Sequence, residues 1–310
     1  MKRFFLLFAI VAVAASCSSV ERREAPVRQG YDDDLYGDVE SVTQEFFWYN
    51  QMPIGDTTIK PSTVDVYRFN KRGDLAATEH NDIVDNRSWG KRCTYDETDR
   101  LLITEAFIGN ATTWRSRYTY NAEGHMIEEQ TDLFLEGKNT KSLYSYDEFG
   151  NQVEHKSYID GEFINRSISK YDEAGREIEY AFYDKNDSLV EQRFSTYDKN
   201  GKITDMIMLR LDVGSCSRYC YERDRSGNAV KITTYNQENE LTDYVTNSFD
   251  GEGNIVEHIS YRNDGSISSR STSKYDAQGN EIENAYYIGA SQNPEYVKRT
   301  TIVYRTQEVE

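Results

Sequence analysis

The sequence predicts an all-β protein of antiparallel β-hairpin repeats, about 26 residues each, that form a curved or spiral single-layer sheet. The main observation is a short phrase: an aromatic residue, then Asp or Asn, and usually Gly three residues later. It occurs nine times, at steps of 25 or 26 residues. A period this regular is typical of one supersecondary unit that is repeated and stacked. The phrases begin at Phe69, Tyr95, Tyr120, Tyr146, Tyr171, Tyr197, Arg223 (the one non-aromatic start), Phe249 and Tyr275.

Composition supports the same fold class. The chain has 24 Tyr, 13% aromatic residues and 29% charged residues, which suits a thin sheet exposed on both faces better than a thick aliphatic core. No Pro occurs between residues 62 and 293, so nothing interrupts the strand ladders there. We therefore expect two strands of roughly eight to ten residues in each repeat.

The phrase itself predicts a turn. In Asp172-Glu-Ala-Gly175 the first side chain can accept backbone N–H groups, and Gly can take a left-handed conformation, as in a type I turn. We favour the three-residue loop in which Gly forms a bulge. Looser turns, such as those at residues 160–161 and 263–265, lie halfway between the phrases and return the chain.

This register assigns side chains to faces, because a one-residue slip exchanges the two sides of a sheet. We expect a buried aliphatic face and an opposite face that collects the phrase tyrosines, a second tyrosine row, an acidic stripe and, along the other strand, a basic stripe. The predicted buried residues are Ile127, Val153, Ile178, Val230, Val256 and Ile282 with Leu143, Ile168 and Phe194. The acidic stripe is Glu128, Glu154, Glu179, Asp205, Glu257 and Glu283, and the basic stripe is Arg115, Lys141, Arg166, Arg218 and Arg270.

The tyrosines and carboxylates of that face form the candidate binding surface. Tyr beside Glu or Asp suits stacking on neutral sugars or docking of cationic peptide segments. The default alternative is structural, since cross-strand ladders also stabilise neighbouring strands and fix register. The candidate residues are Tyr158, Tyr183, Tyr235, Tyr261, Tyr287, Glu154, Glu179, Glu257 and Glu283.

The first residues predict export and lipidation. Met1-Lys2-Arg3 and the apolar run to Ala15 have the pattern of a secretory signal, and the run is too short to remain as a spanning helix. Small residues directly before Cys17 resemble the lipobox of bacterial lipoproteins. That resemblance implies cleavage before Cys17 and acylation of this residue, which would hold the protein on the cell envelope, most simply at the outer membrane.

These features divide the chain into segments. Residues 1–16 are the expected signal peptide, and residues 17–36 are the lipidated cysteine with a polar, flexible tether. Residues 37–310 form the repeat domain, with regular repeats over 61–305 and an N-terminal cap over 37–60. The cap contains an aromatic cluster at residues 46–49 that either covers a sheet end or forms a ligand pocket.

Charge and motifs exclude several functions. Loss of Lys2 and Arg3 takes the net charge from −17 to −19, which disfavours a nucleic-acid partner. We find no catalytic motif and no ligand-rich histidine cluster, so we expect no enzyme, no metal and no cofactor. Cys216 and Cys220 lie roughly 13 Å apart along one expected strand, too far for a disulfide, and with Cys93 they are expected to be free, half-buried residues.

The recurrent Tyr-Asp-x-x-Gly, as at Tyr146, Tyr171, Tyr197 and Tyr275, resembles the YD repeat of the Rhs proteins over about residues 62–305. The resemblance implies hairpins joined edge to edge in a spiralling antiparallel sheet. We expect roughly ten hairpins and no further domain, and therefore we do not expect the sheet to enclose a toxin. Together with the lipoprotein start, the repeats look like exported lipoproteins of Bacteroidetes-type bacteria.

We therefore expect a non-catalytic envelope lipoprotein whose sheet is a recognition or scaffolding surface for a neutral glycan or a protein. One alternative is a structural subunit that adds its sheet edge to a larger envelope assembly. Another is an immunity factor paired with a toxin.

The lipid anchor gives a direct prediction. Cys17→Ser should move the protein from the membrane fraction to the soluble fraction, because only acyl chains would hold a chain of charge about −19 on an anionic surface. Fractionation followed by immunoblotting measures this, and Ser18→Ala is the matched control. Membrane recovery of the Cys17→Ser protein at wild-type level would contradict the anchor.

Overall fold

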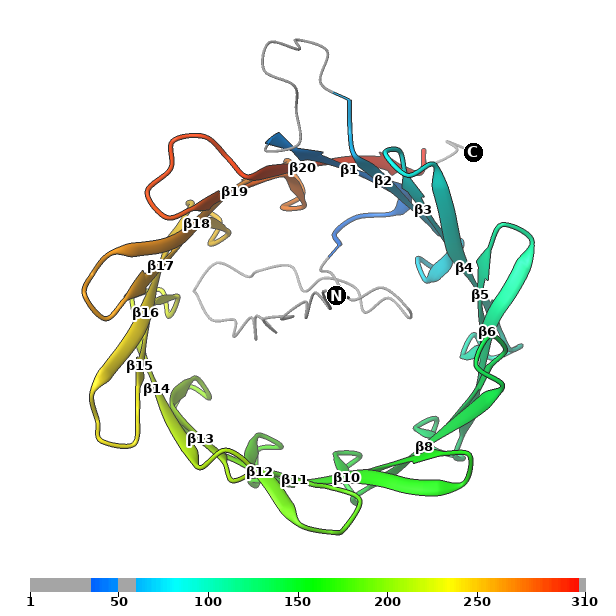
Figure 1. Ribbon diagram of the computed structural model, residues 1–310, viewed down its shortest axis with the longest axis horizontal. Helices are drawn as coiled ribbons and strands as arrows, with labels where there is room; N and C mark the ends of the chain where they lie inside the picture. The colour runs from blue at the N-terminus through cyan, green and yellow to red at the C-terminus, as the bar shows by residue number, and fades with distance from the viewer. Residues whose placement is uncertain (1–34, 50–59, 307–310) are drawn as a thin grey trace.

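The computed structural model describes residues 35–49 and 60–306, and in it twenty antiparallel strands form one closed ring (Figure 1). Consecutive strands pair, and β1 completes the circle by pairing with both β2 and β20. The predicted sheet of antiparallel hairpins is confirmed. The sheet is closed and not an open spiral. The strands are β1 (Val39–Trp48), β2 (Thr63–Phe69), β3 (Leu75–Asp82), β4 (Arg87–Tyr95), β5 (Leu101–Ile108), β6 (Ala111–Tyr120), β7 (Met126–Leu133), β8 (Lys138–Tyr146), β9 (Gln152–Ile159), β10 (Glu162–Tyr171), β11 (Glu177–Tyr183), β12 (Leu189–Tyr197), β13 (Ile203–Arg210), β14 (Ser215–Arg223), β15 (Ala229–Tyr235), β16 (Leu241–Phe249), β17 (Ile255–Arg262), β18 (Ile267–Tyr275), β19 (Glu281–Ile288) and β20 (Tyr296–Tyr304).

The two kinds of turn lie at opposite ends of the ring. The turns inside the phrases form one end, which we call the phrase rim, and the turns between phrases form the other, which we call the flared rim. Figure 1 shows the phrase turns folded toward the centre and the other hairpins flaring outward. Over residues 35–49 and 60–306, no helix is both long and apolar enough to cross a membrane.

The phrase turn has the predicted geometry. Asp172 N–H donates to the Arg176 carbonyl at 3.0 Å, and Gly175 N–H donates to the Asp172 carbonyl at 3.0 Å. The Asp172 carboxylate accepts the N–H groups of Ala174 and Arg176. Gly175 has φ +74°, a left-handed conformation that costs glycine little. The three-residue bulged loop is confirmed.

The predicted division into faces is wrong for the phrase tyrosines. Each hairpin that contains a phrase turn has a second bulge next to the phrase residue. Lys170 pairs with Glu179, whereas Tyr171 pairs with Glu177, so Ile178 is an extra residue. One extra residue moves the end of the strand to the other face. Tyr171 and Ile178 therefore lie on one face, and Glu179 lies on the opposite face with Tyr183 and its partner Arg166.

The predicted buried aliphatic face is also wrong. Ile178 is 38% exposed and Phe194 is 37% exposed, and they lie on opposite faces of the sheet. The reason is that the sheet has a single layer, so neither face is covered by another element along most of the ring. These aliphatic rows contribute partial burial between neighbouring side chains, and they do not form a core.

The hydrophobic core lies at the closure of the ring. Leu35, which precedes β1, packs inside the ring against residues of β1, the end of β2 and the start of β3. The cluster is Leu35, Val39, Val42, Phe69 and Leu75, with Tyr67, Cys93, Ile302 and Tyr304 packed against it. β1 therefore joins the two ends of the repeat array instead of covering a free edge. Residues 50–59 of the predicted N-terminal cap lie outside the described residues.

A hydrogen-bonded latch reinforces this closure. Tyr304 donates its hydroxyl proton to Asp276 at 2.5 Å and accepts a hydrogen bond from the Asn280 amide at 2.7 Å. The Asn280 side chain also bonds both backbone groups of Tyr36. Burial and the Asp276 carboxylate raise the pKa of Tyr304 to about 12. Arg305 completes the latch, since its guanidinium donates to Asp38 and to the carbonyls of Phe69 and Asn70.

One repeated hydrogen bond joins each hairpin to the hairpin before it. The hydroxyl of the phrase tyrosine donates to a main-chain carbonyl at the start of the preceding repeat's second strand, at 2.7–2.9 Å. The pairs are Tyr95 with Leu75, Tyr120 with Leu101, Tyr146 with Met126, Tyr171 with Gln152, Tyr197 with Glu177 and Tyr275 with Ile255.

Three phrases begin without a tyrosine. Phe69 begins the first of them, and in the other two a different side chain donates to the equivalent carbonyl. Arg223 begins one phrase, and its guanidinium donates to the Ile203 carbonyl at 3.0 Å. Phe249 begins the next and has no hydroxyl, but the amide of Asn247, two residues earlier, donates to the Ala229 carbonyl at 2.8 Å. The fold therefore requires a donor at this place and not a particular side chain.

This substitution predicts a rescue. Asn247→Ala should destabilise the protein by about 1 kcal/mol, because the Ala229 carbonyl loses its side-chain donor. Adding Phe249→Tyr should restore most of that loss by supplying the hydroxyl that six other phrases use. Urea unfolding of the wild type, both single variants and the double variant measures the coupling. Simple additivity of the two substitutions would contradict the equivalence of the two donors.

Candidate functional site

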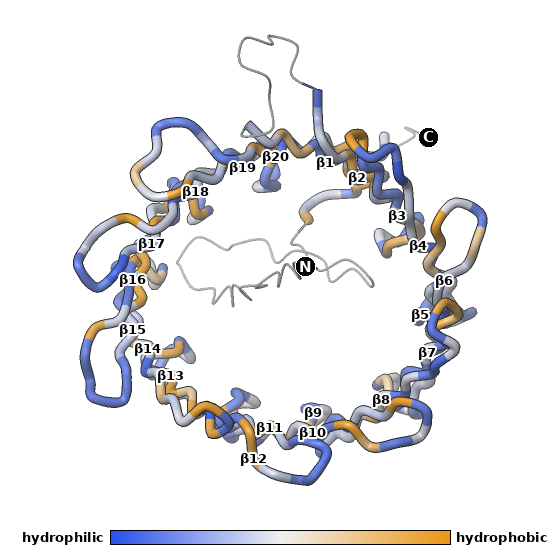
Figure 2. Tube along the Cα trace, viewed as in Figure 1, coloured by the Kyte–Doolittle hydropathy of each residue, from blue (hydrophilic) through white to orange (hydrophobic). Residues whose placement is uncertain are grey.

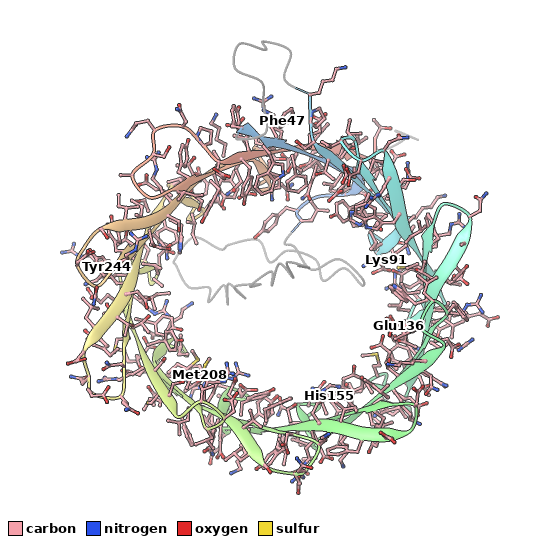
Figure 3. The ribbon with its side chains drawn as sticks, in the orientation of Figure 1. Phe47, Lys91, Glu136, His155, Met208 and Tyr244 are labelled. Atoms are coloured by element: carbon pink, nitrogen blue, oxygen red, sulfur yellow. The ribbon has the colours of Figure 1, made fainter. Side chains whose placement is uncertain are left out.

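The two faces of the ring differ in chemistry. Figure 3 shows His155 and Met208 pointing into the ring and Phe47 and Tyr244 pointing outward. Because directly paired residues of antiparallel strands share a face, the register extends this assignment to their neighbours. Tyr144 and Ser167, which pair with His155, are therefore inner residues, and Tyr261, which pairs with Tyr244, is an outer residue.

The arc from β7 to β11 illustrates the difference. Nine inner positions there include one carboxylate and no Lys or Arg, whereas the nine matching outer positions include six ionised side chains. The inner residues are Glu129, Thr131, Ser142, Tyr144, His155, Ser157, Ser167, Ser169 and Tyr180. The outer residues are Glu128, Gln130, Lys141, Leu143, Glu154, Lys156, Arg166, Ile168 and Glu179.

All the residues of the predicted binding surface lie on the outer face, and neighbouring side chains already engage many of the tyrosines. The Arg166 guanidinium lies 4.5 Å from the centre of the Tyr183 ring, and Arg270 lies 4.2 Å from that of Tyr287. Tyr261 stacks on Tyr244 at 4.5 Å. The remaining two rings contact or pair with their neighbours: Tyr158 lies edge-on to Phe163, and Tyr235 pairs across the strands with Arg218.

The predicted carboxylates are engaged in the same way. Glu179 binds Lys170 at 2.7 Å and Glu283 binds Lys274 at 2.7 Å, and these contacts hold the pKa of both carboxyls below the usual range. Glu154 contacts Lys156 and Arg166, and Glu257 contacts Arg270. The acidic and basic stripes thus pair with each other across strands. These contacts are the cross-strand ladders of the structural alternative, and a ligand on the outer face stays a prediction.

A different site lies on the inner side, at the phrase rim between the turns of the β6–β7 and β8–β9 hairpins. It is a hollow of about 400 Å³, a size typical of small-molecule pockets. Its lining comes from two neighbouring repeats, so neither repeat forms it alone. The lining residues are Asn121, Glu123, His125, Ile127, Tyr144, Ser145, Tyr146, Asp147, Glu148 and Gly150.

Two stacked aromatic pairs border this hollow. His125 lies against Tyr146 with ring centres 4.7 Å apart, and Tyr144 lies against His155 at 4.9 Å with a 15° angle between the planes. The hydroxyl of Tyr146 is held by the Met126 carbonyl at 2.7 Å, which fixes its ring. Burial raises the pKa of both tyrosines, so they remain neutral hydrogen-bonding groups.

The polar groups of the hollow divide into fixed and exposed ones. Asp147 accepts the N–H groups of Phe149 and Asn151 and the Asn151 amide, and these bonds lower the pKa of its carboxyl. Glu123 and Glu148 are exposed at the turns. Flat rings beside carboxylate acceptors can stack on a sugar ring and accept its hydroxyl protons.

The sequence analysis did not single out this hollow. Tyr144 was not selected because it lies two residues before a phrase tyrosine, outside the rows that were compared. His125 was overlooked because it follows a turn glycine and has no equivalent histidine in other repeats. A signal was present in the paired tyrosines Tyr118-Thr-Tyr120 and Tyr144-Ser-Tyr146, since residues two apart in a strand share a face.

The second inner histidine site is structural. His258 Nδ1 lies 2.7 Å from Asn247 Oδ1, and the Asn247 amide nitrogen donates to the Ala229 carbonyl. That donation orients the amide, so its oxygen accepts from a protonated Nδ1, and Nε2 is left to accept from the Ser260 hydroxyl at 3.4 Å. Across residues 35–49 and 60–306, no group of three or more His, Cys, Asp or Glu could hold a metal ion.

The cysteines of the ring lie on both faces. Cys93, Cys216 and Cys220 are free and half-buried, as expected from their spacing. Cys216 and Cys220 lie on the outer side of β14, where Cys220 donates to Asp205 at 3.3 Å, and burial raises the pKa of the Cys220 thiol. Cys17 lies outside the described residues.

Comparisons with known proteins found a matching family model and similar solved structures. A family model described only as an uncharacterised protein matches residues 164–229, and no curated protein matches the chain. Among solved structures, the chain is similar to TcdB2-TccC3 with 12% identity and a TM-score of 0.41, over 84% of this chain and 16% of that one. It is also similar to a porin-like protein from Bacteroides uniformis ATCC 8492, with 9% identity and a TM-score of 0.36, over 87% of this chain and 99% of that one.

The inner histidines predict a loss of stability in mild acid. Burial lowers the pKa of His258 and of His155 below the ordinary 6.5, with Glu129 opposing the shift at His155. The unfolded chain then binds more protons than the folded one, so this stability is complete above about pH 6.5 and is lost as the pH falls through the folded pKa values.

Urea unfolding at about pH 7.5 and about pH 5 measures the effect. His155→Gln combined with His258→Gln should reduce the difference between the two pH values. A control with His125→Gln should leave most of it in place. If the stability difference between the two pH values is unchanged in the variant with both His155→Gln and His258→Gln, other groups titrate in this range.

Proposed function

We propose that this protein is a non-catalytic, lipid-anchored envelope protein of the YD-repeat type whose ring binds a neutral glycan on its inner face. The observation that carries the proposal is the inner hollow with its stacked pairs His125–Tyr146 and Tyr144–His155. Aromatic faces beside hydroxyl and carboxylate groups bind sugars through stacking and hydrogen bonds. The outer tyrosines, in contrast, are occupied by neighbouring side chains.

The charge distribution supports a neutral ligand. The chain carries −17 overall, and removal of Lys2 and Arg3 with a signal peptide gives −19. A sulfated or uronic-acid polymer would be repelled at long range. The nine inner positions named above on the arc from β7 to β11 include no Lys or Arg, so they offer an anionic ligand no counter-charge.

The placement on the envelope rests on the predicted lipid anchor at Cys17 and on the entry of the chain at the phrase rim, where Tyr36 bonds Asn280. The paired charges of the outer face suit contact with water, since ionised side chains are costly in hydrocarbon. Each of the twenty strands has two partners, which weakens the alternative of a structural subunit that adds an open sheet edge to an assembly.

Binding can be measured with the full chain lacking residues 1–16 and carrying Cys17→Ser. A glycan array identifies neutral oligosaccharides that bind, and calorimetry gives their affinity. Tyr144→Ala should weaken binding by roughly 10- to 100-fold, as loss of an aromatic hot spot does. Tyr183→Ala is the matched control, because it removes a tyrosine from the outer face.

Three outcomes would contradict the proposal: no neutral oligosaccharide binds, Tyr183→Ala weakens binding while Tyr144→Ala does not, or only Lys- and Arg-rich peptides bind. The last result would favour a protein ligand for the same hollow. Circular dichroism of both variants shows whether the sheet is intact.

A further inference from the structure

Exposed apolar side chains gather on one arc of the flared rim. At the tips of the β3–β4 and β7–β8 hairpins, Val84 is 70% exposed and Leu135 is 74% exposed. Figure 2 shows hydrophobic segments on the flared hairpin between β5 and β6, which lies between these two. We call this set the apolar arc; it consists of Ile83, Val84, Ile108, Phe134, Leu135 and Ile159.

Other turns of the flared rim are polar and have a different geometry. The flared-rim turns of the β11–β12, β15–β16 and β17–β18 hairpins lie in the other half of the ring and contain polar residues at 184–188, 236–240 and 263–266. They are three-residue loops closed by a backbone hydrogen bond, as from Asp184 to Ser188 and from Asn236 to Glu240. The β3–β4 and β7–β8 tips are four-residue loops in which the N–H of Ile83 or Phe134 donates to the carbonyl of Ser62 or Thr113. Outside the arc, Leu211 and Val213 lie in the four-residue turn between β13 and β14, and Ile288 at the end of β19 is 57% exposed.

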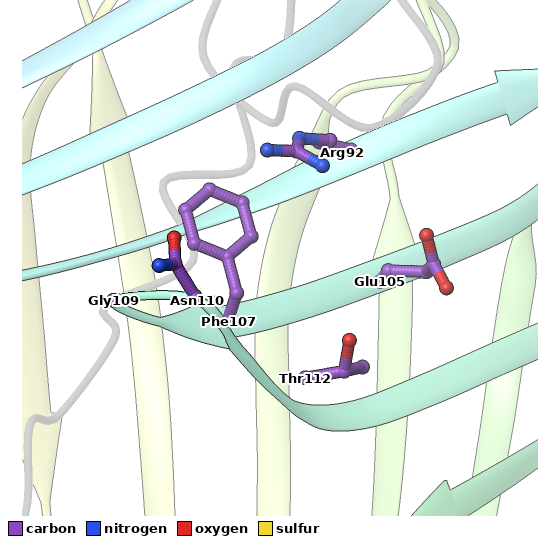
Figure 4. A pocket seen from close by; sticks show the side chains of 6 residues that line it. All are labelled: Arg92, Glu105, Phe107, Gly109, Asn110 and Thr112. Carbon is purple, nitrogen blue, oxygen red and sulfur yellow. The ribbon is translucent and has the colours of Figure 1, made fainter.

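A shallow depression of about 160 Å³ lies within the arc, beside the Gly109–Asn110 turn (Figure 4). The Phe107 ring forms one wall, and the Arg92 guanidinium lies 4.9 Å from its centre. The ring fits because residue 90 is glycine: a Cβ there would lie 2.8 Å from the Phe107 ring and 2.2 Å from the Thr78 carbonyl oxygen.

The depression connects directly with the next hairpin. Glu105 binds Arg115 at 2.5 Å, and the same guanidinium lies 6.0 Å from the centre of the Phe134 ring. Phe134 is thus linked through Arg115 to Glu105 at the depression, and 48% of Phe134 remains exposed. These contacts connect the β5–β6 and β7–β8 hairpins of the arc.

The charges around the arc determine the kind of partner. Six carboxylates and four cationic side chains lie around the depression and on the turns and strand ends that carry the apolar tips, so the surface has a surplus of negative charge. They are Asp82, Asp85, Glu105, Glu136, Asp160 and Glu162 against Arg87, Arg92, Arg115 and Lys138. Anionic lipid headgroups would be repelled by such a surface, whereas a protein with Lys or Arg around an apolar patch would be attracted.

We propose that the apolar arc of the flared rim docks a partner protein through an apolar segment flanked by basic residues. Exposed apolar groups rimmed by polar ones mark interaction sites, and large ones on adjacent tips can serve as anchors. The site is distinct from the inner hollow, which lies at the phrase rim. Leu35, the first described residue, also packs at the phrase rim, and the arc lies at the opposite rim.

A helical peptide of about 18 residues with Leu on one face and Lys on the other serves as the probe, and the same pattern with Glu in place of Lys is its counterpart. The protein is the full chain lacking residues 1–16 with Cys17→Ser. Phe134→Asn with Leu135→Gln should weaken binding of the Lys peptide at least 10-fold without changing the net charge. Leu211→Gln with Val213→Asn is the matched control, since it removes exposed apolar residues outside the arc, and it should bind like the wild type.

Equal binding of the Lys peptide by both double variants would overturn the proposal, because general charge attraction would then explain it. The proposal would also be overturned if the wild type bound the Glu peptide as tightly as the Lys peptide. If vesicles of anionic phosphatidylglycerol bind the wild type and lose binding in the Phe134 and Leu135 variant, the arc is a membrane contact instead. Leu135→Gln alone, at a tip that is 74% exposed, tests the same point if the double variant proves unstable.

Discussion

The side-chain hydrogen bond that joins a phrase hairpin to a carbonyl of the preceding hairpin is the interaction on which the ring depends. A single-layer sheet has no second layer to pack against, and most of its side chains are half-buried at best. Each such bond contributes about 0.5–1.5 kcal/mol net, and it recurs at eight carbonyls around the ring. Arg223 and Asn247 donate where tyrosine is missing. The fold therefore requires a donor for this carbonyl and not the aromatic ring of tyrosine.

Closure then decides which surfaces are available. β1 pairs with β2 and β20, and the small core around Leu35 and Val42 seals the junction together with the Tyr304 latch. With both neighbours paired, no described strand offers a free edge. The phrase turns fold inward at one rim and the variable hairpins flare at the other, so the two ends of the ring present different chemistry.

On the arc from β7 to β11 the outer face is charged and the inner face is mostly uncharged, because side chains alternate between the faces along each strand. The outer acidic and basic rows neutralise each other across strands, as in the pair of Asp205 with Arg218 at 2.6 Å. Exposed pairs of this kind add little stability individually, but they leave few charges without a partner. The inner face keeps Tyr, Ser and His side chains, and two stacked ring pairs meet there beside the hollow at Tyr144. The apolar arc adds a third surface, at the end opposite the hollow.

Local chemistry in the sequence was enough to determine the repeat length, the antiparallel hairpins and the bulged turn at Asp172–Gly175, because a type I turn with Gly depends only on adjacent residues. It was not enough to determine the second bulge at Ile178, since that depends on pairing between strands, and this one residue exchanged the faces of the phrase tyrosines. Whether the sheet closes depends on curvature summed over twenty strands, and the hollow combines His125 and Tyr144 from different hairpins. Only the tertiary structure decided the closure and the hollow, because both result from contacts between repeats that a single repeat does not encode.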